Sequence, residues 1–163
     1  MALTPEQQQA LAADVAADPA FAALPHNSDG AYAVAAAYNL LASPDFIVWR
    51  SSVSQDEIMQ NGFDWVRVDN LSVGKARIWE WLFNNQSRSM NPSKINVRAG
   101  IDEVWKGTAA DLAVRAAVYA HCTRKATRAE KLFATGTGTE ASPATMTQDG
   151  SLSYNEVQAA LGW

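Results

Sequence analysis

The residues of this chain that most often carry out catalysis are few. His26 and His121 are the only histidines, and Cys122 is the only cysteine. His121 and Cys122 are neighbours in a segment predicted to be helical, so their side chains point about 100° apart and cannot pair as nucleophile and base. His26 lies between Pro25 and Asn27, a setting typical of a turn. The sequence predicts no catalytic residue, and we expect that the protein is not an enzyme.

Two glycine-containing segments are incomplete versions of known ligand-binding loops. Gly136 and Gly138 are followed by no Lys-Ser/Thr pair and preceded by no predicted strand, so phosphate binding is not expected. Residues 145–156 (TMTQDGSLSYNE) match a calcium loop at its glycine and final glutamate. However, threonines stand at positions one and three, where calcium needs carboxylate or amide oxygens. A turn before a capped helix explains the same residues, and we predict neither a metal nor a cofactor.

Four basic residues lie close together near the end of the chain: Arg124, Lys125, Arg128 and Lys131. If this segment is helical, the spacing places Arg124, Arg128 and Lys131 on one face. That face could meet phosphate, an acidic protein surface or only water. Because no aromatic residue accompanies the cluster to stack on bases, we expect an acidic subunit surface first and passing DNA second.

The charges are distributed unevenly along the chain. The net charge is −4, but residues 1–69 hold nine acidic and two basic residues, whereas residues 70–131 hold eleven basic and five acidic ones. An acidic total argues against a general nucleic-acid binder. The pattern suits a subunit that docks its acidic face on the basic face of a neighbour, and a mixed solvated surface is the alternative.

Helix signals dominate the elements that must position these residues. Two segments stay ambiguous: 46–50 is too short to assign, and 63–68 alternates like a strand or an extended linker. Apolar runs fall far short of the ~20 residues that span a bilayer, and the start lacks the features of a signal peptide. Capping boxes and apolar spacing predict helices at 4–18, 28–41, 54–61, 69–85, 91–107, 108–122, 127–135 and 153–161.

The tryptophans are many for 163 residues, with six in the chain. In the helix predicted at 69–85, Trp81 shares a face with Ile78 and Leu82 and is predicted to pack in the core. Trp79 lies about 200° from Trp81, so we predict that it contacts a second layer or a neighbouring subunit. In the next helix, Ile95 is expected to face inward.

Residues 135–150 form a Thr/Gly/Ser-rich segment in which Met146 is the clear large apolar residue. Such a segment cannot bury enough surface to offset its ordering entropy, so we expect it to become ordered against a partner. A small β-hairpin around 148–150 is one alternative for 144–153. Met146, Tyr154 and Trp163 join Trp79 and the four basic residues as candidate interface residues.

The sequence thus predicts an all-α protein with two parts. Residues 1–134 form a single helical domain of six or seven helices, and residues 135–163 form an extended arm with a short C-terminal helix.

Several sequence segments of the chain resemble small virion proteins encoded in the head and tail morphogenesis region of tailed bacteriophages. The similarity covers roughly residues 14–157, and its phrases include no catalytic or metal-binding signature. They are VDNLSVGKARIWEWLF (68–83), NPSKINVRAGIDEVWKGT (91–108), RKATRAEKLFATGTGTEASPATM (124–146) and GSLSYNEV (150–157).

By its length and helical architecture with an arm, the chain resembles the head–tail adaptor of short-tailed phages. The resemblance implies a ring of twelve copies between the portal protein and the tail nozzle or another tail protein, lining the channel for genomic DNA. It also implies a virion protein that is assembled in the host cytoplasm and has no membrane contact. A capsid decoration or tail-completion protein is one alternative, and a nucleic-acid-binding regulator is another.

Overall fold

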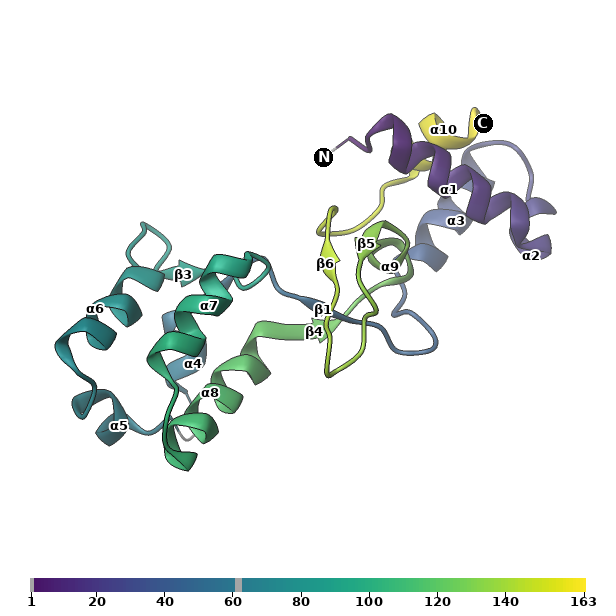
Figure 1. The fold of residues 1–163 in the computed structure, drawn as a ribbon. Helices are drawn as coiled ribbons and strands as arrows, with labels where there is room; N and C mark the ends of the chain where they lie inside the picture. The colour runs from purple at the N-terminus through teal and green to yellow at the C-terminus, as the bar shows by residue number, and fades with distance from the viewer. Residues whose placement is uncertain (1, 61–62) are drawn as a thin grey trace. The chain divides into compact units, whose positions relative to one another are not determined.

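The computed structural model describes residues 2–60 and 63–163, and its chain divides into two compact units (Figure 1). Unit 1 comprises Met1–Val48 and Lys125–Trp163, and unit 2 comprises Trp49–Arg124. The chain therefore leaves unit 1 once and returns to it once. The crossing points fall within two paired strands, β1 (Ile47–Trp49) and β4 (Thr123–Lys125).

Unit 1 contains five helices and one further strand pair among its described residues. The antiparallel pair joins Ala134 to Met146 and Thr135 to Thr145. The elements are α1 (Pro5–Ala17), α2 (Pro19–Ala22), α3 (Ser28–Tyr38), α9 (Arg128–Phe133), β5 (Ala134–Thr135), β6 (Thr145–Met146) and α10 (Tyr154–Leu161).

Unit 2 also contains five described helices and one strand pair. Here the antiparallel pair joins Val53 to Met90 and Ser54 to Ser89. The elements are β2 (Val53–Ser54), α4 (Gln55–Met59), α5 (Trp65–Asp69), α6 (Val73–Leu82), β3 (Ser89–Met90), α7 (Ile95–Val104) and α8 (Ala109–Cys122). No helix in the described part of either unit is both long and apolar enough to cross a membrane.

The capping signals of the sequence are confirmed. At each site the side chain of the N-cap residue accepts a hydrogen bond from the backbone three residues on, and the partner side chain accepts one from the N-cap backbone. The five boxes are Thr4/Gln7, Ser54/Glu57, Thr108/Asp111, Thr127/Glu130 and Ser153/Glu156. The expected end of the helix that Ser54 caps, at 61–62, lies outside the described residues.

The predicted fold class, a single all-α domain of six or seven helices, is wrong. The described residues form ten helices and three two-stranded sheets. The two unexpected helices, α2 and α5, have only four and five residues, too few for apolar periodicity to reveal, and α5 occupies the segment that alternates like a strand. The strands have two or three residues and pair across long stretches of sequence, so no local pattern marks them.

The core of unit 1 lies between α1, α3, α9 and α10. Leu11 and Val15 of α1 meet Val34 and Tyr38 of α3 and Val157 of α10, and all five are buried. Side chains four residues apart on one helix lie on one face, so each helix contributes one apolar stripe to this core.

An aromatic cluster forms the core of unit 2. Trp79 packs edge-to-face against Trp105 and Phe83, at ring-centroid distances of 5.4 and 5.1 Å. Trp79 is 3% exposed, whereas Trp81 is 69% exposed. The prediction that Trp81 packs in the core is therefore wrong, and Trp79, which was predicted to contact a second layer or a neighbouring subunit, is the tryptophan that lies in the core. Ile95, also expected inside, is 77% exposed.

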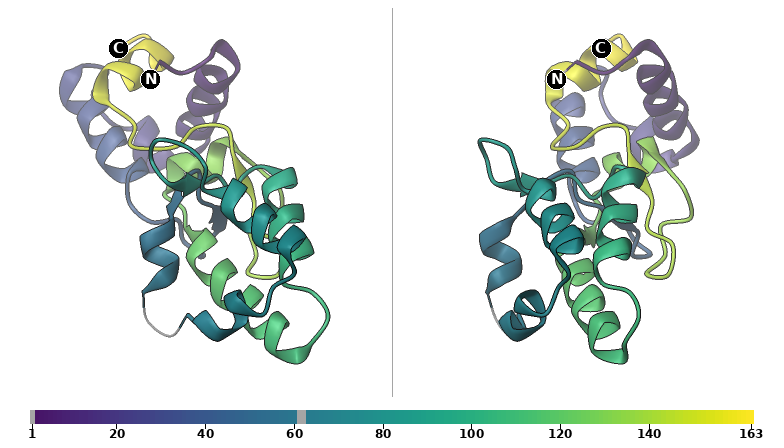
Figure 2. Two further views of the ribbon diagram at one scale, coloured as in Figure 1. Left: turned by 90° about the vertical axis from the view of Figure 1, so that its left-hand side faces the viewer. Right: turned by 60° about the vertical axis from the view of Figure 1, so that its left-hand side comes forward.

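Helices α6 and α7 pack against each other (Figure 2). Ile78 and Leu82 face α7 at Gly100, where a Cβ would lie 3.2 Å from a methyl of Leu82. On a helical wheel, Trp79 and Trp81 lie about 80° to either side of the midline between Ile78 and Leu82. Local spacing therefore cannot choose between them, and only the position of the remaining core does.

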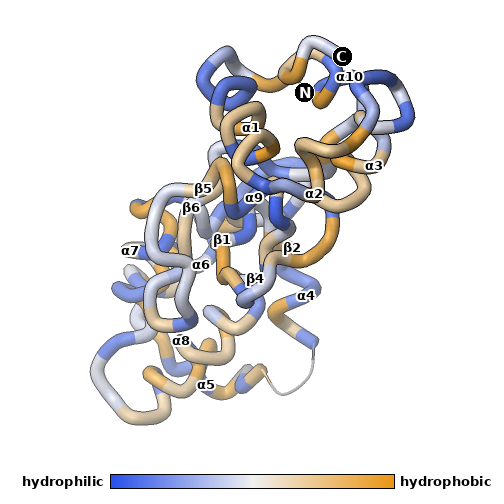
Figure 3. Tube along the Cα trace, turned by 90° about the vertical axis from the view of Figure 1, so that its right-hand side faces the viewer, coloured by the Kyte–Doolittle hydropathy of each residue, from blue (hydrophilic) through white to orange (hydrophobic). Residues whose placement is uncertain are grey.

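The arm does not extend away from unit 1, as the sequence had suggested. The Ile47 N–H donates to the Gly138 carbonyl at 2.8 Å, and the Ile47 carbonyl accepts from Ala144 N–H at 2.9 Å. The arm thus straps β1, which is one of the hydrophobic stretches of the chain (Figure 3). The expected hairpin around 148–150 is also wrong, because β6 pairs with β5 instead.

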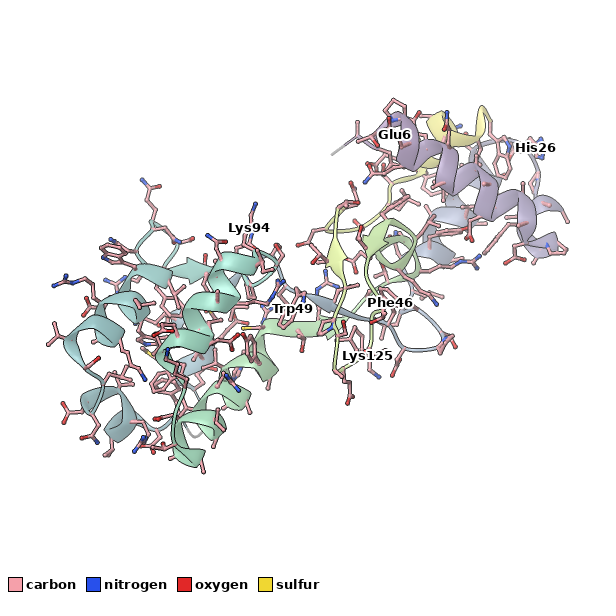
Figure 4. The ribbon with its side chains drawn as sticks, viewed as in Figure 1. Glu6, His26, Phe46, Trp49, Lys94 and Lys125 are labelled. Atoms are coloured by element: carbon pink, nitrogen blue, oxygen red, sulfur yellow. The ribbon has the colours of Figure 1, made fainter. Side chains whose placement is uncertain are left out.

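We call the part of the arm that binds β1, residues 138–144, the strap. At Gly138 the strap lies very close to the rest of unit 1. The φ of Gly138 is +67°, and a Cβ there would lie 2.1 Å from the ring of Phe46 (labelled in Figure 4). Only glycine fits both constraints, since a side chain would be strained by the left-handed backbone and would also overlap the ring.

The exposures of the two tryptophans predict opposite effects on stability. We expect Trp79→Ala to lower the free energy of unfolding by roughly 3–5 kcal/mol, because it leaves a cavity in the aromatic core. Trp81→Ala should change it by less than about 0.5 kcal/mol. Chemical denaturation followed by circular dichroism measures both. Equal losses for the two variants would contradict the observed orientation of α6.

The contact between the strap and Phe46 can be isolated with a matched pair of glycine variants. Gly162 has nearly the same φ, +69°, but nothing within 4 Å of a Cβ. Both Gly138→Ala and Gly162→Ala should lose about 1–2 kcal/mol from left-handed strain. Gly138→Ala should lose a further ~1–3 kcal/mol from overlap with the ring. Equal losses of unfolding free energy in the two variants would show that the strap moves away from the Phe46 ring without an energetic penalty.

Candidate interaction surfaces

Arg128, the first residue of α9, joins α9 to α1. Its guanidinium donates to the carboxylate of Asp14 at 3.0 Å and to that of Asp18 at 3.3 Å. It also lies over the rings of Phe21 and Tyr38, 4.8 and 4.5 Å from their centroids. A planar guanidinium can stack on rings and donate in its own plane at the same time, which an ammonium group cannot do.

This arrangement changes the interpretation of the basic cluster. Asp14 and Asp18 belong to the acidic first third that was expected to dock on a neighbouring subunit, yet here they bind Arg128 of their own chain. The Tyr38 hydroxyl donates to Asp14 as well. Burial, followed by the hydrogen bond to Asp14, raises the pKa of Tyr38 above its usual value, so the hydroxyl stays protonated and keeps donating. Arg128 is committed to the structure of unit 1.

The expected single basic face does not form, because Arg124 and Lys125 lie in β4 rather than in a helix with Arg128. Lys125 forms an ion pair with Asp45 at 2.6 Å. Lys131 remains on α9, and its ammonium nitrogen lies 5.7 Å from the centroid of the Phe46 ring. The helix predicted at 127–135 does begin at the Thr127 cap, so Arg124 and Lys125 lie before it.

A groove of about 690 Å³ opens beside Arg128 and Lys131, and we call it the leucine groove. Leu40 and Leu41, which stand in it, are 67% and 60% exposed. Its lining consists of Asp14, Ala37, Leu40, Leu41, Ala42, Ser43, Arg128, Lys131 and Leu132. The helix predicted at 28–41 would have included both leucines, whereas α3 ends at Tyr38.

The exposed leucines are held rigidly by the backbone on both sides. The Arg128 N–H donates to the Leu40 carbonyl at 2.9 Å, and the Ala42 N–H donates to the Ala126 carbonyl at 3.0 Å. Leu41 and Thr127 form an antiparallel bridge between these two bonds. Two adjacent leucines presented to solvent by a fixed backbone are typical of a contact surface.

The three other candidate residues of unit 1 pack within their own unit. Met146 packs against the small cluster of Val48, Ala126 and Ala144. Tyr154 stacks on Tyr32 with 4.3 Å between ring centroids, and Trp163 stacks on His26 (labelled in Figure 4) at 4.7 Å. Beside this second stack is an apolar pocket of about 340 Å³ between α1 and α10.

A second exposed surface lies on α6 of unit 2. Val73, Arg77 and Trp81 follow one another at four-residue spacing, so they form a stripe on one face. Two grooves border this stripe, one of about 560 Å³ and one of about 330 Å³, and Glu80 lines both. Trp79 is the candidate interface residue that the sequence predicted on this helix, but its side chain is buried. Trp81 is the tryptophan of α6 that is exposed on the surface.

The residues considered for chemistry have structural roles. Cys122 is buried, and burial raises the pKa of its thiol to about 12, which keeps it protonated and a poor nucleophile. Glu156, the last residue of the calcium-like segment, accepts from the Ser153 backbone at 2.8 Å as a helix cap. In the described residues, no three His, Cys, Asp or Glu side chains gather as a metal site would require.

The stacked, doubly paired Arg128 should contribute more to stability than an exposed ion pair. We expect Arg128→Ala and Arg128→Lys each to lower the free energy of unfolding of unit 1 by roughly 1–2 kcal/mol. Alanine removes both the charge and the stacking on the rings, whereas lysine keeps the charge but loses the planar stacking. Lys125→Ala is the control, and its exposed pair with Asp45 should contribute less than about 1 kcal/mol. Denaturation showing Arg128→Lys as stable as the unmodified protein would reduce Arg128 to a plain surface charge.

No match to this chain is found among protein-family models, characterised proteins or solved structures. A functional proposal therefore has to be built on the residues, the surfaces and the charges described above.

Proposed function

We propose that the protein is a structural virion subunit that forms a head-to-tail ring, the adaptor between the portal and the tail of a phage. The observation that carries the proposal is the unequal charge of the two units. Unit 1 holds nine acidic and three basic residues, and unit 2 holds ten basic and eight acidic ones. A chain with one acidic and one mildly basic unit can associate with copies of itself through two different surfaces.

The exposed apolar residues support the same proposal. The leucine groove of unit 1 and the Val73–Trp81 stripe of unit 2 are two different surfaces of one chain, and each exposes large apolar side chains. Contact between unlike patches produces a ring when the rotation between copies closes. The virion role comes from the resemblance of the chain's sequence segments to small phage virion proteins, and the adaptor role comes from the resemblance in length and helical architecture. A ring that matched a portal would have twelve copies.

The test is the mass of the assembly. We expect sedimentation velocity of the purified chain to show association that weakens as salt rises, since the attraction between the units of different copies is screened. Addition of the portal protein should yield a discrete complex with about twelve copies of the 17.6 kDa chain.

Two outcomes would contradict this function. A chain that stays monomeric at every salt concentration, with and without the portal protein, would exclude a ring subunit. Tight binding of the monomer to duplex DNA, with a steep loss of affinity as salt rises, would favour a nucleic-acid-binding regulator instead.

A further inference from the structure

We propose that Trp81 of one copy inserts into the leucine groove of the next copy and that Glu80 of the first pairs with Lys131 of the second. This inference rests on the proposed function and names the two surfaces that would join the copies. It places the contact between unit 2 of one chain and unit 1 of another.

Trp81 has the character of an anchor residue. It is 69% exposed on a helix whose other tryptophan, Trp79, fills the core. Tryptophan carries a large apolar surface, roughly 150–250 Å², whose exposure to water is unfavourable. Such residues are the ones that most often dominate the binding energy of protein interfaces.

The leucine groove has the size and chemistry to receive an indole. Its volume is about 690 Å³, and Leu40, Leu41 and Leu132 supply its apolar surface. Because the backbone of Leu40 and Ala42 is already held by hydrogen bonds to the 126–128 segment, the groove loses little conformational freedom when it is filled.

The charges beside the two surfaces are complementary. Glu80 precedes Trp81 and is exposed, and Lys131 lines the groove. Within the described residues, neither forms an ion pair, whereas the other charges of the groove, Asp14 and Arg128, are already paired with each other. When Trp81 enters the groove, the carboxylate of Glu80 would therefore reach Lys131, the basic residue of the groove lining that has no ion pair among the described residues.

A second copy is the occupant that these observations favour. Both halves of the contact are on the same chain but on different surfaces, so every copy can offer Trp81 to one neighbour and the groove to another. The acidic excess of unit 1 and the basic excess of unit 2 favour the same orientation of approach.

The first experiment measures self-association of the full chain by sedimentation equilibrium at low ionic strength. Trp81→Ala should weaken association more than about tenfold, as expected for an anchor residue. Ile95→Ala is the matched control, because Ile95 is 77% exposed on α7 and outside both surfaces. Denaturation of each variant checks that the monomer stays folded.

The second experiment tests the charge pair. Glu80→Lys and Lys131→Glu should each weaken association, and the chain carrying both changes should recover most of it, since the pair is restored with reversed signs. Lys94→Glu controls for the change in net charge, because Lys94 is exposed and lies outside the groove.

The third experiment tests the head-to-tail arrangement by mixing two defective chains. Trp81→Ala keeps the groove but lacks the anchor, and Leu41→Lys keeps the anchor but blocks the groove. Each should fail to form large assemblies alone, and an equimolar mixture should form heterodimers and stop there, since only one junction is intact.

The outcomes separate this inference from the proposed function. Assemblies that survive Trp81→Ala and both charge reversals unchanged would overturn the Trp81 contact and leave the ring function standing. The same result would follow if the groove received a segment of another protein. An unmodified chain that never self-associates, with or without the portal protein, would overturn both.

Discussion

The buried carboxyl group of Glu130 is the constraint on which unit 1 depends. Glu130 is 2% exposed, and burial of a carboxyl group is unfavourable unless hydrogen bonds replace its hydration. It accepts from the Thr127 backbone at 2.9 Å and from the Gly150 backbone at 3.2 Å. One side chain thus caps α9 and also binds the backbone at Gly150, which holds this part of the arm against unit 1.

The other residues of α9 extend this effect to the rest of the unit. Arg128 binds α1 through Asp14 and Asp18, and the carbonyl of Phe133 accepts from the Thr147 hydroxyl at 2.6 Å. The Arg128 backbone holds Leu40 on the surface. The six residues of α9 thus bind α1, the arm and the backbone of Leu40 at the same time. These contacts leave the side chains of Leu40 and Leu41 exposed in the leucine groove.

Much of the local structure could be predicted. Five capping boxes fixed where α1, α4, α8, α9 and α10 begin, because each one joins groups only three residues apart and needs no distant partner. For the candidate surfaces, the sequence singled out the basic residues near Arg128 and tryptophans 79 and 81. It assigned the wrong environment to Arg128 and reversed the two tryptophans.

The sequence by itself thus determined where the five helices with capping boxes start and which residue types are available for contacts, whereas α6 and α7, predicted from residues 69 and 91, start at Val73 and Ile95. Only the tertiary structure decided which tryptophan of α6 is buried, where Arg128 finds its carboxylates and how the arm packs. Arg128 and Asp14 are 114 residues apart, and the strap joins Ile47 to Gly138. Such pairings depend on the simultaneous packing of several elements, and the spacing of residues within one helix or strand contains no record of them.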